Sequence, residues 1–149
     1  NCGGKFMKAS SFFEEHIKKN KGRFVFLGEI SDRERLFSLV KNAYACILPT
    51  RVDNLPNTCL EAMALGKIVV SSTCGYGTSV EQLVTDGCNG FLAQVDDAGD
   101  LARKIVHVMQ LTQEEKALIE GRAKERVKDL TPEKVYGKMM EVYSTVLRP

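Results

Sequence analysis

Residues 53–70 read DNLPNTCLEAMALGKIVV, and this stretch decides the fold. An acidic residue in a polar loop precedes a helix that we expect to begin near Pro56. Gly66 predicts where that helix ends, since glycine is favoured just after the last helical turn. The β-branched run Ile68–Val70 then predicts a short strand. The stretch therefore forms a unit of loop, helix and strand.

The rest of the chain alternates between strand and helix signals in the same way. Short apolar runs predict strands at Arg23–Leu27, Ala45–Leu48, Ile68–Ser71 and Phe91–Ala93. Capping signals predict that helices begin at Ser11, Ser31, Thr78, Thr112 and Thr131, and apolar spacing predicts another over residues 101–109. Such alternation predicts an α/β fold, a Rossmann-like doubly wound parallel sheet of about four strands with C-terminal helices. With 149 residues we expect one domain over 1–149, of which 112–149 are a helical C-terminal extension.

Composition limits the classes of function. The net charge of +2 gives no electrostatic case for binding nucleic acid or a membrane surface, so we expect no nucleic-acid partner and leave membrane association open. No apolar run approaches the ~20 residues that span a bilayer, and no signal peptide is visible. The five cysteines form no Cys-x-x-Cys pair, and several lie in or beside apolar runs. We therefore expect buried thiols in a reducing cytoplasm.

The deciding stretch also places two carboxylates around a helix N-terminus. The first turn of a helix has unpaired N–H groups and a partial positive charge, which favour a phosphate. Asp53 lies just before this terminus, and Glu61 lies five residues beyond Pro56, a rise of ~7.5 Å. Carboxylates on both sides of a phosphate cradle can accept hydrogen bonds from the hydroxyls at both ends of a nucleotide sugar. Without such a ligand, Asp53 is a turn or N-cap residue and Glu61 a solvated helix residue.

Further candidates lie at the ends of predicted strands. Pro49 and Thr50 follow the Ala45–Leu48 strand, and open α/β sheets bind ligands at this carboxyl edge. They either border a nucleotide base or simply end the strand. Gly75 and Tyr76 follow the next strand, and Tyr76 either covers part of the ligand or lies in a plain surface loop. No residue spacing indicates a metal or a nicotinamide cofactor, so we expect neither.

The chain resembles a known family along most of its length. The run acid-x7-Glu, followed by Ala-Met-Ala-x-Gly and a strand, is joined in order and spacing by Phe24–Gly28, Ala45–Thr50 and Asp86–Leu92. From about Arg23 to the C-terminus, the chain is similar to the donor-binding half of family-4-type retaining glycosyltransferases, which have the GT-B fold. The family usually has Glu in the first acid position, where this chain has Asp53.

The resemblance implies a role for each candidate residue. The donor is a nucleotide-diphosphate sugar, linked to UDP or GDP, whose sugar passes to an acceptor hydroxyl with retention, as in polysaccharide biosynthesis. Asp53 and Glu61 are then the catalytic pair, in which Asp53 orients the sugar and Glu61 binds the ribose 2′ and 3′ hydroxyls. The backbone N–H groups of Asn57 and Thr58 contact the phosphates. No residue is assigned as a covalent nucleophile.

The resemblance also implies missing parts. A full donor domain of the family has six strands, and four are predicted here. In the common doubly wound order 3-2-1-4-5-6, strands 1 and 2 lie between strands 3 and 4, and we expect this order here. Loss of the first strand, its helix and most of the second leaves Arg23–Leu27 without a partner beside Ala45–Leu48. We therefore expect a chain truncated at its N-terminus, without the acceptor-binding N-terminal domain, that binds nucleotide weakly and does not catalyse. Either that other domain or this domain's own sheet covers the apolar stripe of the last helix, which consists of Val135, Met139, Val142, Tyr143 and Val146.

Two other functions stay open. Asp53 in the usual place of Glu supports a Rossmann-like nucleotide-binding or interaction module that has lost transferase chemistry. A GT-B sugar-nucleotide epimerase shares the phosphate site at the helix terminus, but the Glu-Ala-Met-Ala-x-Gly run fits that class less well.

Overall fold

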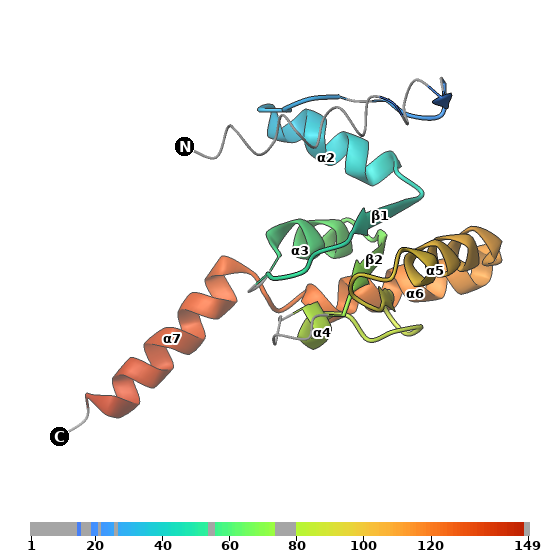
Figure 1. Cartoon of the computed structure of the whole chain (residues 1–149). Coiled ribbons are helices and arrows are strands. Elements are labelled where there is room, and N and C mark those ends of the chain that lie inside the picture. Colours follow the sequence, from blue (N-terminus) through green and yellow to red (C-terminus); the bar gives the residue numbers. More distant parts are fainter. Residues whose placement is uncertain are drawn as a thin grey trace. The chain divides into compact units, whose positions relative to one another are not determined.

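A computed structural model describes residues 15, 19–20, 22–25, 27–53, 56–73 and 80–147 (Figure 1). The chain divides into two compact units, residues 1–33 and 34–149. In the first unit, the Arg23 N–H donates to the Asn20 carbonyl at 3.1 Å, and an exposed ion pair at 2.8 Å joins Lys19 and Glu15. The helix predicted from Ser11 lies largely outside the described residues.

The prediction of a strand at Arg23–Leu27 is wrong. Of its described residues, Phe24, Val25 and Leu27 belong to no strand, and their side chains are 57%, 81% and 51% exposed. A strand is held by hydrogen bonds to a neighbouring strand. The described part of the first unit contains no strand that could supply them. An apolar run of this kind therefore forms a strand only where its neighbour is present.

The second unit is built on a parallel sheet of three strands, β1 (Ala45–Leu48), β2 (Ile68–Ser72) and β3 (Phe91–Ala93). The strands lie in the order β1-β2-β3, with Ala45 opposite Ile68. Parallel neighbours need a crossover connection, which is usually a helix. The sheet confirms the predicted Rossmann-like α/β fold and three of its four expected strands.

The helices of the described structure are α2 (Arg33–Asn42), α3 (Asn57–Ala64), α4 (Val80–Leu83), α5 (Ala98–Gln110), α6 (Gln113–Val127) and α7 (Pro132–Val146). α2 begins two residues after its predicted start at Ser31. α3 begins directly after Pro56, and Gly66 follows its end with a φ of 71°, as predicted. Among the described residues, no helix is both long enough and apolar enough to cross a bilayer.

The helix starts predicted at Thr112 and Thr131 are confirmed. The Thr112 hydroxyl accepts the N–H of Glu115 at 3.2 Å, and the Glu115 carboxylate accepts the N–H of Thr112 at 2.9 Å, which completes a capping box. The Thr131 hydroxyl accepts the N–H of Lys134 at 3.4 Å, and Pro132 begins α7. Local signals therefore set where both C-terminal helices begin.

Thr112→Ala should lower the free energy of unfolding by about 1 kcal/mol, because it removes the N-cap hydroxyl of α6. The backbone N–H of Thr112, and after it the hydroxyl, hold the pKa of Glu115 below its usual range. A carboxyl with a depressed folded-state pKa adds stability above its unfolded pKa and loses it as pH falls through the folded pKa. Urea melts near neutral pH and near pH ~3 should therefore show a smaller Thr112→Ala effect in acid. An effect of equal size at both pH values would mean that the box does not depend on the Glu115 charge.

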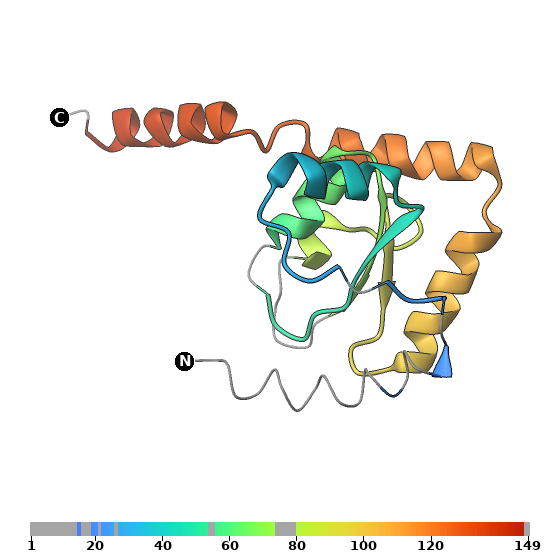
Figure 2. The same ribbon diagram turned by 90° about the horizontal axis from the view of Figure 1, so that it is seen from above.

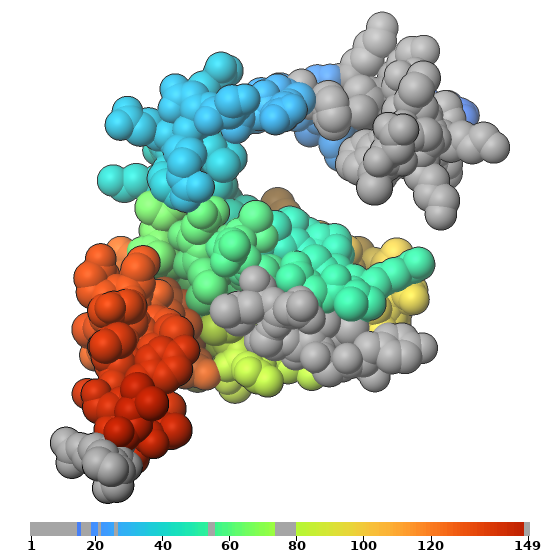
Figure 3. Space-filling view, turned by 90° about the vertical axis from the view of Figure 1, so that its left-hand side faces the viewer, coloured from blue at the N-terminus to red at the C-terminus, as the bar shows by residue number. Residues whose placement is uncertain are grey.

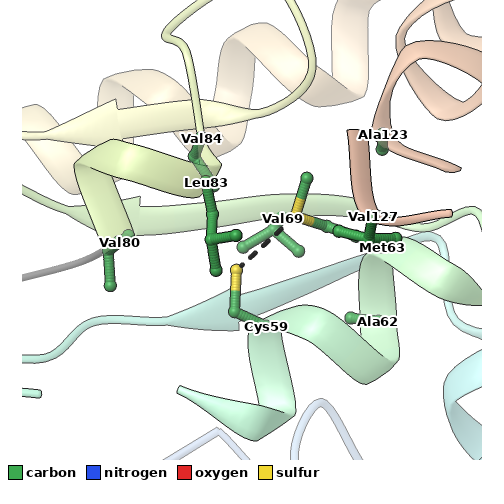
Figure 4. Close-up of a cluster of buried hydrophobic side chains, with 9 residues drawn as sticks. All are labelled: Cys59, Ala62, Met63, Val69, Val80, Leu83, Val84, Ala123 and Val127. Atoms are coloured by element: carbon green, nitrogen blue, oxygen red, sulfur yellow. Dashed lines mark hydrogen bonds between the residues drawn. The ribbon is translucent and has the colours of Figure 1, made fainter. Parts of the chain in front are cut away.

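The two faces of the sheet pack against different helices. Side chains alternate along β2, so that Val69 points to one face and Ile68 and Val70 to the other. Figure 4 shows the first cluster, which consists of Val69 with Cys59, Ala62, Met63, Val80, Leu83, Val84, Ala123 and Val127. The second cluster consists of Ile68 and Val70 with Phe91, Val108 and Ile119. α3 and α5 accordingly lie on opposite sides of the sheet (Figure 2).

The last two helices differ in how they pack. α6 buries Ile119, Ala123 and Val127 against the sheet. α7 buries no residue, and its side chains are in view in Figure 3, where the helix is red. The stripe predicted on α7 is exposed, by 42% at Val135, 48% at Met139, 61% at Val142, 53% at Tyr143 and 74% at Val146. The alternative that this domain's own sheet covers the α7 stripe is therefore wrong for the described structure, whereas the other domain as its partner stays a prediction.

Candidate functional site

The N-terminus of α3 lacks a side-chain cap. Its N-cap residue is Pro56, with φ −67° and ψ 107°, and no side chain accepts a hydrogen bond there. The Pro56 carbonyl accepts the N–H groups of Cys59 at 2.9 Å and Leu60 at 3.2 Å, which close the first helical turn. The N–H groups of Asn57 and Thr58 make no hydrogen bond to a described residue, and both residues are exposed. Two donors at the positive end of the helix dipole are therefore available to an anion.

Three other helices of the second unit are capped. A side chain accepts a first-turn N–H at the start of α5, where Asp97 accepts from Asp100 at 2.8 Å, and Thr112 and Thr131 do the same for α6 and α7. Proline has no side-chain acceptor, so the sequence leaves α3 without this contact. The uncapped terminus follows directly from Pro56 at the N-cap.

The two predicted acids lie on either side of this terminus in the chain. Asp53 is half-buried before α3, and Glu61 is half-buried within it. Glu61 is four residues beyond Asn57, a rise of ~6 Å along the helix. Between them Cys59 is fully buried, as predicted, with its Sγ 3.8 Å from the Met63 sulfur. α3 thus presents Glu61 and its first N–H groups while Cys59 and Met63 fix it to the core.

The Cys59 thiol has a raised pKa. Burial, together with smaller contributions from the charges of Cys46 and Asp53, raises its pKa to about 11. Asp53 does not cap the helix, since no side chain accepts a hydrogen bond at its N-terminus. A thiol with this pKa stays protonated at neutral pH, so Cys59 is a packing residue here and not a nucleophile.

Pro49 and Thr50 lie at the carboxyl end of β1, as predicted, and line a cavity of about 310 Å³. Thr50 Oγ1 is buried and has no hydrogen-bond partner within the part of the chain that the structure describes. The cavity lies between the ends of all three strands and the start of α5, and its lining consists of Pro49, Thr50, Arg51, Ser72, Gln94, Val95, Asp96, Asp97, Ala98 and Leu101. We predicted only the first two of these residues from the sequence. The prediction of a strand at Phe91–Ala93 could have indicated the rest, because parallel strands bring their carboxyl ends to one edge.

Thr50→Val should raise the free energy of unfolding by up to about 1 kcal/mol. The variant replaces a buried hydroxyl, which forms no hydrogen bond to any described residue, by a methyl group of similar shape, so no such bond is lost. Urea denaturation of the wild type and the variant would measure this difference. A clear loss of stability would mean that the hydroxyl has a partner after all, such as an ordered water.

The remaining candidates from the sequence add no residue to the site. Gly75 and Tyr76 lie outside the described residues. The acidic residues that follow β3 lie at the start of α5, where Asp97 caps the helix and Asp100 accepts the N–H of Gln94 at 2.7 Å. Among the described residues, no three His, Cys, Asp or Glu side chains are grouped so that they could hold a metal ion. The acidic run is thus accounted for by the helix start.

Comparison with known proteins identifies the family. The family described as glycosyl transferases group 1 matches residues 2–111, and the chain belongs to it. An uncharacterized glycosyltransferase of Methanocaldococcus jannaschii is 28% identical over 127 residues, which are 85% of this chain and 35% of that protein. The phosphatidyl-myo-inositol mannosyltransferase of Mycolicibacterium smegmatis is 28% identical over 84% of this chain and 31% of that protein. The chain thus spans about a third of the length of these relatives.

Solved structures show the same fold. Sucrose-phosphate synthase from Thermosynechococcus elongatus matches 90% of this chain and 33% of its own, with a TM-score of 0.77 and 26% identity. Anabaena HepE, solved in complex with UDP, matches 95% of this chain and 38% of its own, with a TM-score of 0.78 and 21% identity. The C-terminal domain of a group 1 glycosyl transferase from Francisella tularensis matches 84% of this chain and 63% of its own, with a TM-score of 0.73 and 17% identity. The fold is that of the C-terminal domain of a GT-B glycosyltransferase.

Proposed function

We propose that this chain is the donor-binding part of a retaining glycosyltransferase, which transfers a sugar from a nucleotide-diphosphate sugar to an acceptor hydroxyl. The observation that carries the proposal is the uncapped N-terminus of α3, where two exposed N–H groups lie between Asp53 and Glu61 in the chain. Membership of the group 1 glycosyltransferase family supports it. A relative in fold, Anabaena HepE, was solved with UDP, a nucleoside diphosphate of the kind proposed here.

Each part of this terminus has a distinct role in the proposal. The N–H groups of Asn57 and Thr58 donate to the diphosphate, whose negative charge grows as its bond to the sugar breaks, so they bind the transition state more tightly than the substrate. Asp53 accepts hydrogen bonds from the sugar hydroxyls, and Glu61 accepts them from the ribose. The new bond to the acceptor oxygen forms on the face that the diphosphate leaves, and the proton of the acceptor hydroxyl passes to an oxygen of the departing diphosphate. We assign no covalent nucleophile.

The chain is proposed to act as part of a longer protein. It spans about a third of the relatives' length, and the acceptor-binding domain is proposed to lie in the remainder. Residues 1–149 are then a single partial donor domain with residues 112–149 as its helical extension. The isolated chain is expected to bind nucleotide weakly and to transfer no sugar.

Calorimetric titration with UDP, GDP and their glucose or mannose conjugates tests the proposal. One base should bind, and Glu61→Ala should weaken it about tenfold or more, because hydrogen bonds to a charged group contribute about 1.5–3 kcal/mol. Glu114→Ala, at an exposed position of α6, is the matched control and should bind as the wild type does. Equal affinity in wild type and Glu61→Ala would contradict the proposed role of Glu61. If none of the ligands binds to a folded chain, the same titration on the longer protein shows whether the donor site has lost its affinity for nucleotides.

A second function is favoured by one observation, which is Asp53 in the position where the family usually has Glu. Its carboxylate lies about one methylene closer to the backbone, so its reach toward the sugar is shorter. If the chain has lost transferase chemistry and only binds a nucleotide, Glu61→Ala should abolish saturable binding of the nucleotide sugar while Asp53→Ala leaves it unchanged. Loss of affinity for the sugar conjugate in Asp53→Ala, with unchanged affinity for the nucleotide alone, would instead favour the transferase.

A further inference from the structure

The segment Asp86–Leu92 is part of the family resemblance, but it has no role in the proposed function. Within it, Asn89 is a buried polar side chain, only 4% exposed. Its Oδ1 accepts the N–H of Thr85 at 2.7 Å, and its Nδ2 donates to the Leu83 carbonyl at 3.0 Å. Leu83 is the last residue of α4, so both bonds fix the end of that helix.

The side chain of Asn89 is not needed to close the turn in which it lies. The N–H of Gly87 donates to the Gly90 carbonyl at 2.9 Å, and Gly87 has a φ of 70°, which favours glycine. The Asp86 carboxylate accepts the N–H of Leu92 in β3 at 2.9 Å, which ties the turn to the sheet. Other groups therefore form and anchor the turn, while the Asn89 side chain bonds to the end of α4.

A second donor reaches the same end of α4. The guanidinium group of Arg126 in α6 donates to the Gln82 carbonyl at 2.5 Å. The last carbonyls of a helix have no partner within the helix, so such donors satisfy them. With only four residues, Val80–Leu83, α4 is too short to be stable by itself. Its position is therefore set by Asn89, by Arg126 and by its packing in the core.

That packing brings α4 against the first turn of α3. Val80 and Leu83 are buried in the same cluster as Cys59, and Figure 4 shows the side chains of Leu83 and Cys59 pointing toward one another. Cys59 is the third residue of α3, and its N–H donates to the Pro56 carbonyl at 2.9 Å. Because core side chains are close-packed, a shift of α4 would move Cys59 and the N–H groups next to it. These are the groups proposed to bind the diphosphate.

We infer that Asn89 is a positioning residue for the proposed diphosphate site, because it holds α4 against the first turn of α3. The inference rests on the proposed function for the ligand. Arg126 supports α4 in the same way, and neither side chain contacts the diphosphate itself. Without Asn89, the buried Leu83 carbonyl loses its partner, and α4 has to shift or open before water can replace it.

The test uses the full chain and two variants, Asn89→Ala and Arg126→Ala. Arg126 is exposed, so its truncation keeps the fold, and this variant decides the question if Asn89→Ala does not fold. Val108→Ala is the control for lost stability, because Val108 is buried in the cluster on the other face of the sheet. Arg122→Ala, also exposed on α6, is the control for a lost charge. Thermal melts set a temperature at which all five proteins are folded.

Two measurements report on the first turn of α3. The first is amide hydrogen exchange without ligand, in which Cys59 and Leu60 should exchange about threefold to tenfold faster relative to Val70 in both variants. Val70 is the reference because it is fully buried in the central strand β2, where exchange requires opening of the whole domain. The second is calorimetry, in which the affinity for UDP or GDP should fall by about threefold to tenfold. Neither control should change the exchange ratio or the affinity.

A raised exchange ratio with a loss of affinity in Asn89→Ala or Arg126→Ala would support the inference. An unchanged ratio in both variants, or a raised ratio with unchanged affinity for the nucleotide, would overturn it. Failure of the proposed function is distinguishable, because the exchange measurement needs no ligand. A wild-type chain that binds neither UDP nor GDP would contradict the diphosphate site, while a raised ratio in Asn89→Ala would still support its role in positioning α3.

Discussion

Met63→Ala is expected to lower the free energy of unfolding by about 2–5 kcal/mol, the range for truncating a large buried side chain. Met63 is fully buried on α3, with its sulfur 3.8 Å from the Cys59 Sγ and Val69 of β2 in the same cluster (Figure 4). Truncation leaves a cavity where α3 meets the sheet, and the surrounding side chains relax into it only partly. Urea denaturation followed by circular dichroism measures the change.

The matched control is Met109→Ala on α5. Met109 is 68% exposed, so its truncation should change the free energy of unfolding by no more than about 0.5 kcal/mol. Because α3 carries Glu61 and the proposed phosphate donors, Met63→Ala should also weaken nucleotide binding, while Met109→Ala should not. A Met63→Ala variant as stable as the wild type would mean that α3 is not held to the sheet through this cluster.

The sequence was sufficient for features that depend on neighbouring residues. The capping box of Thr112 and Glu115, the end of α3 at Gly66 and the strand at Phe91–Ala93 were predicted correctly. Each of these depends on contacts within a few residues or on a β-branched or apolar run, and such signals are readable one segment at a time. The order of the three strands followed from the usual doubly wound arrangement.

Features that depend on distant parts of the chain were not predictable in the same way. The run Arg23–Leu27 has a strand's composition, but its described residues pair with no neighbour. The cavity beside Thr50 exists because the ends of three strands meet the start of α5, and residues 94–98 carry no local motif for it. Thr50 shares this cavity with residues more than 20 positions away, such as Ser72 and Gln94. For this reason the sequence located the N-terminus of α3 but not the cavity beside Thr50.

Asn57→Pro is expected to weaken binding of the nucleoside diphosphate by about tenfold or more without loss of stability. The substitution deletes one backbone N–H that we propose to donate to the phosphates, and a hydrogen bond to a charged group contributes about 1.5–3 kcal/mol. Proline is favoured at the first helical position, which Asn57 occupies in α3. The preceding residue must be extended before a proline, and Pro56 already is, with ψ 107°.

Asn57→Ala keeps the N–H and removes only the side chain, so comparison of the two variants isolates the backbone donor. Calorimetry with UDP or GDP should show near wild-type affinity for Asn57→Ala and a large loss for Asn57→Pro, with equal melting temperatures. Equal losses of affinity in the two variants would mean that the Asn57 side chain contacts the phosphate. Unchanged affinity in both would contradict a phosphate contact through the Asn57 N–H. Thr58→Pro cannot serve in its place, because Asn57 is helical there and a helical residue before proline is disfavoured. The geometry of α3 thus makes Asn57 the position at which the proposed phosphate contact can be deleted with least disturbance to the fold.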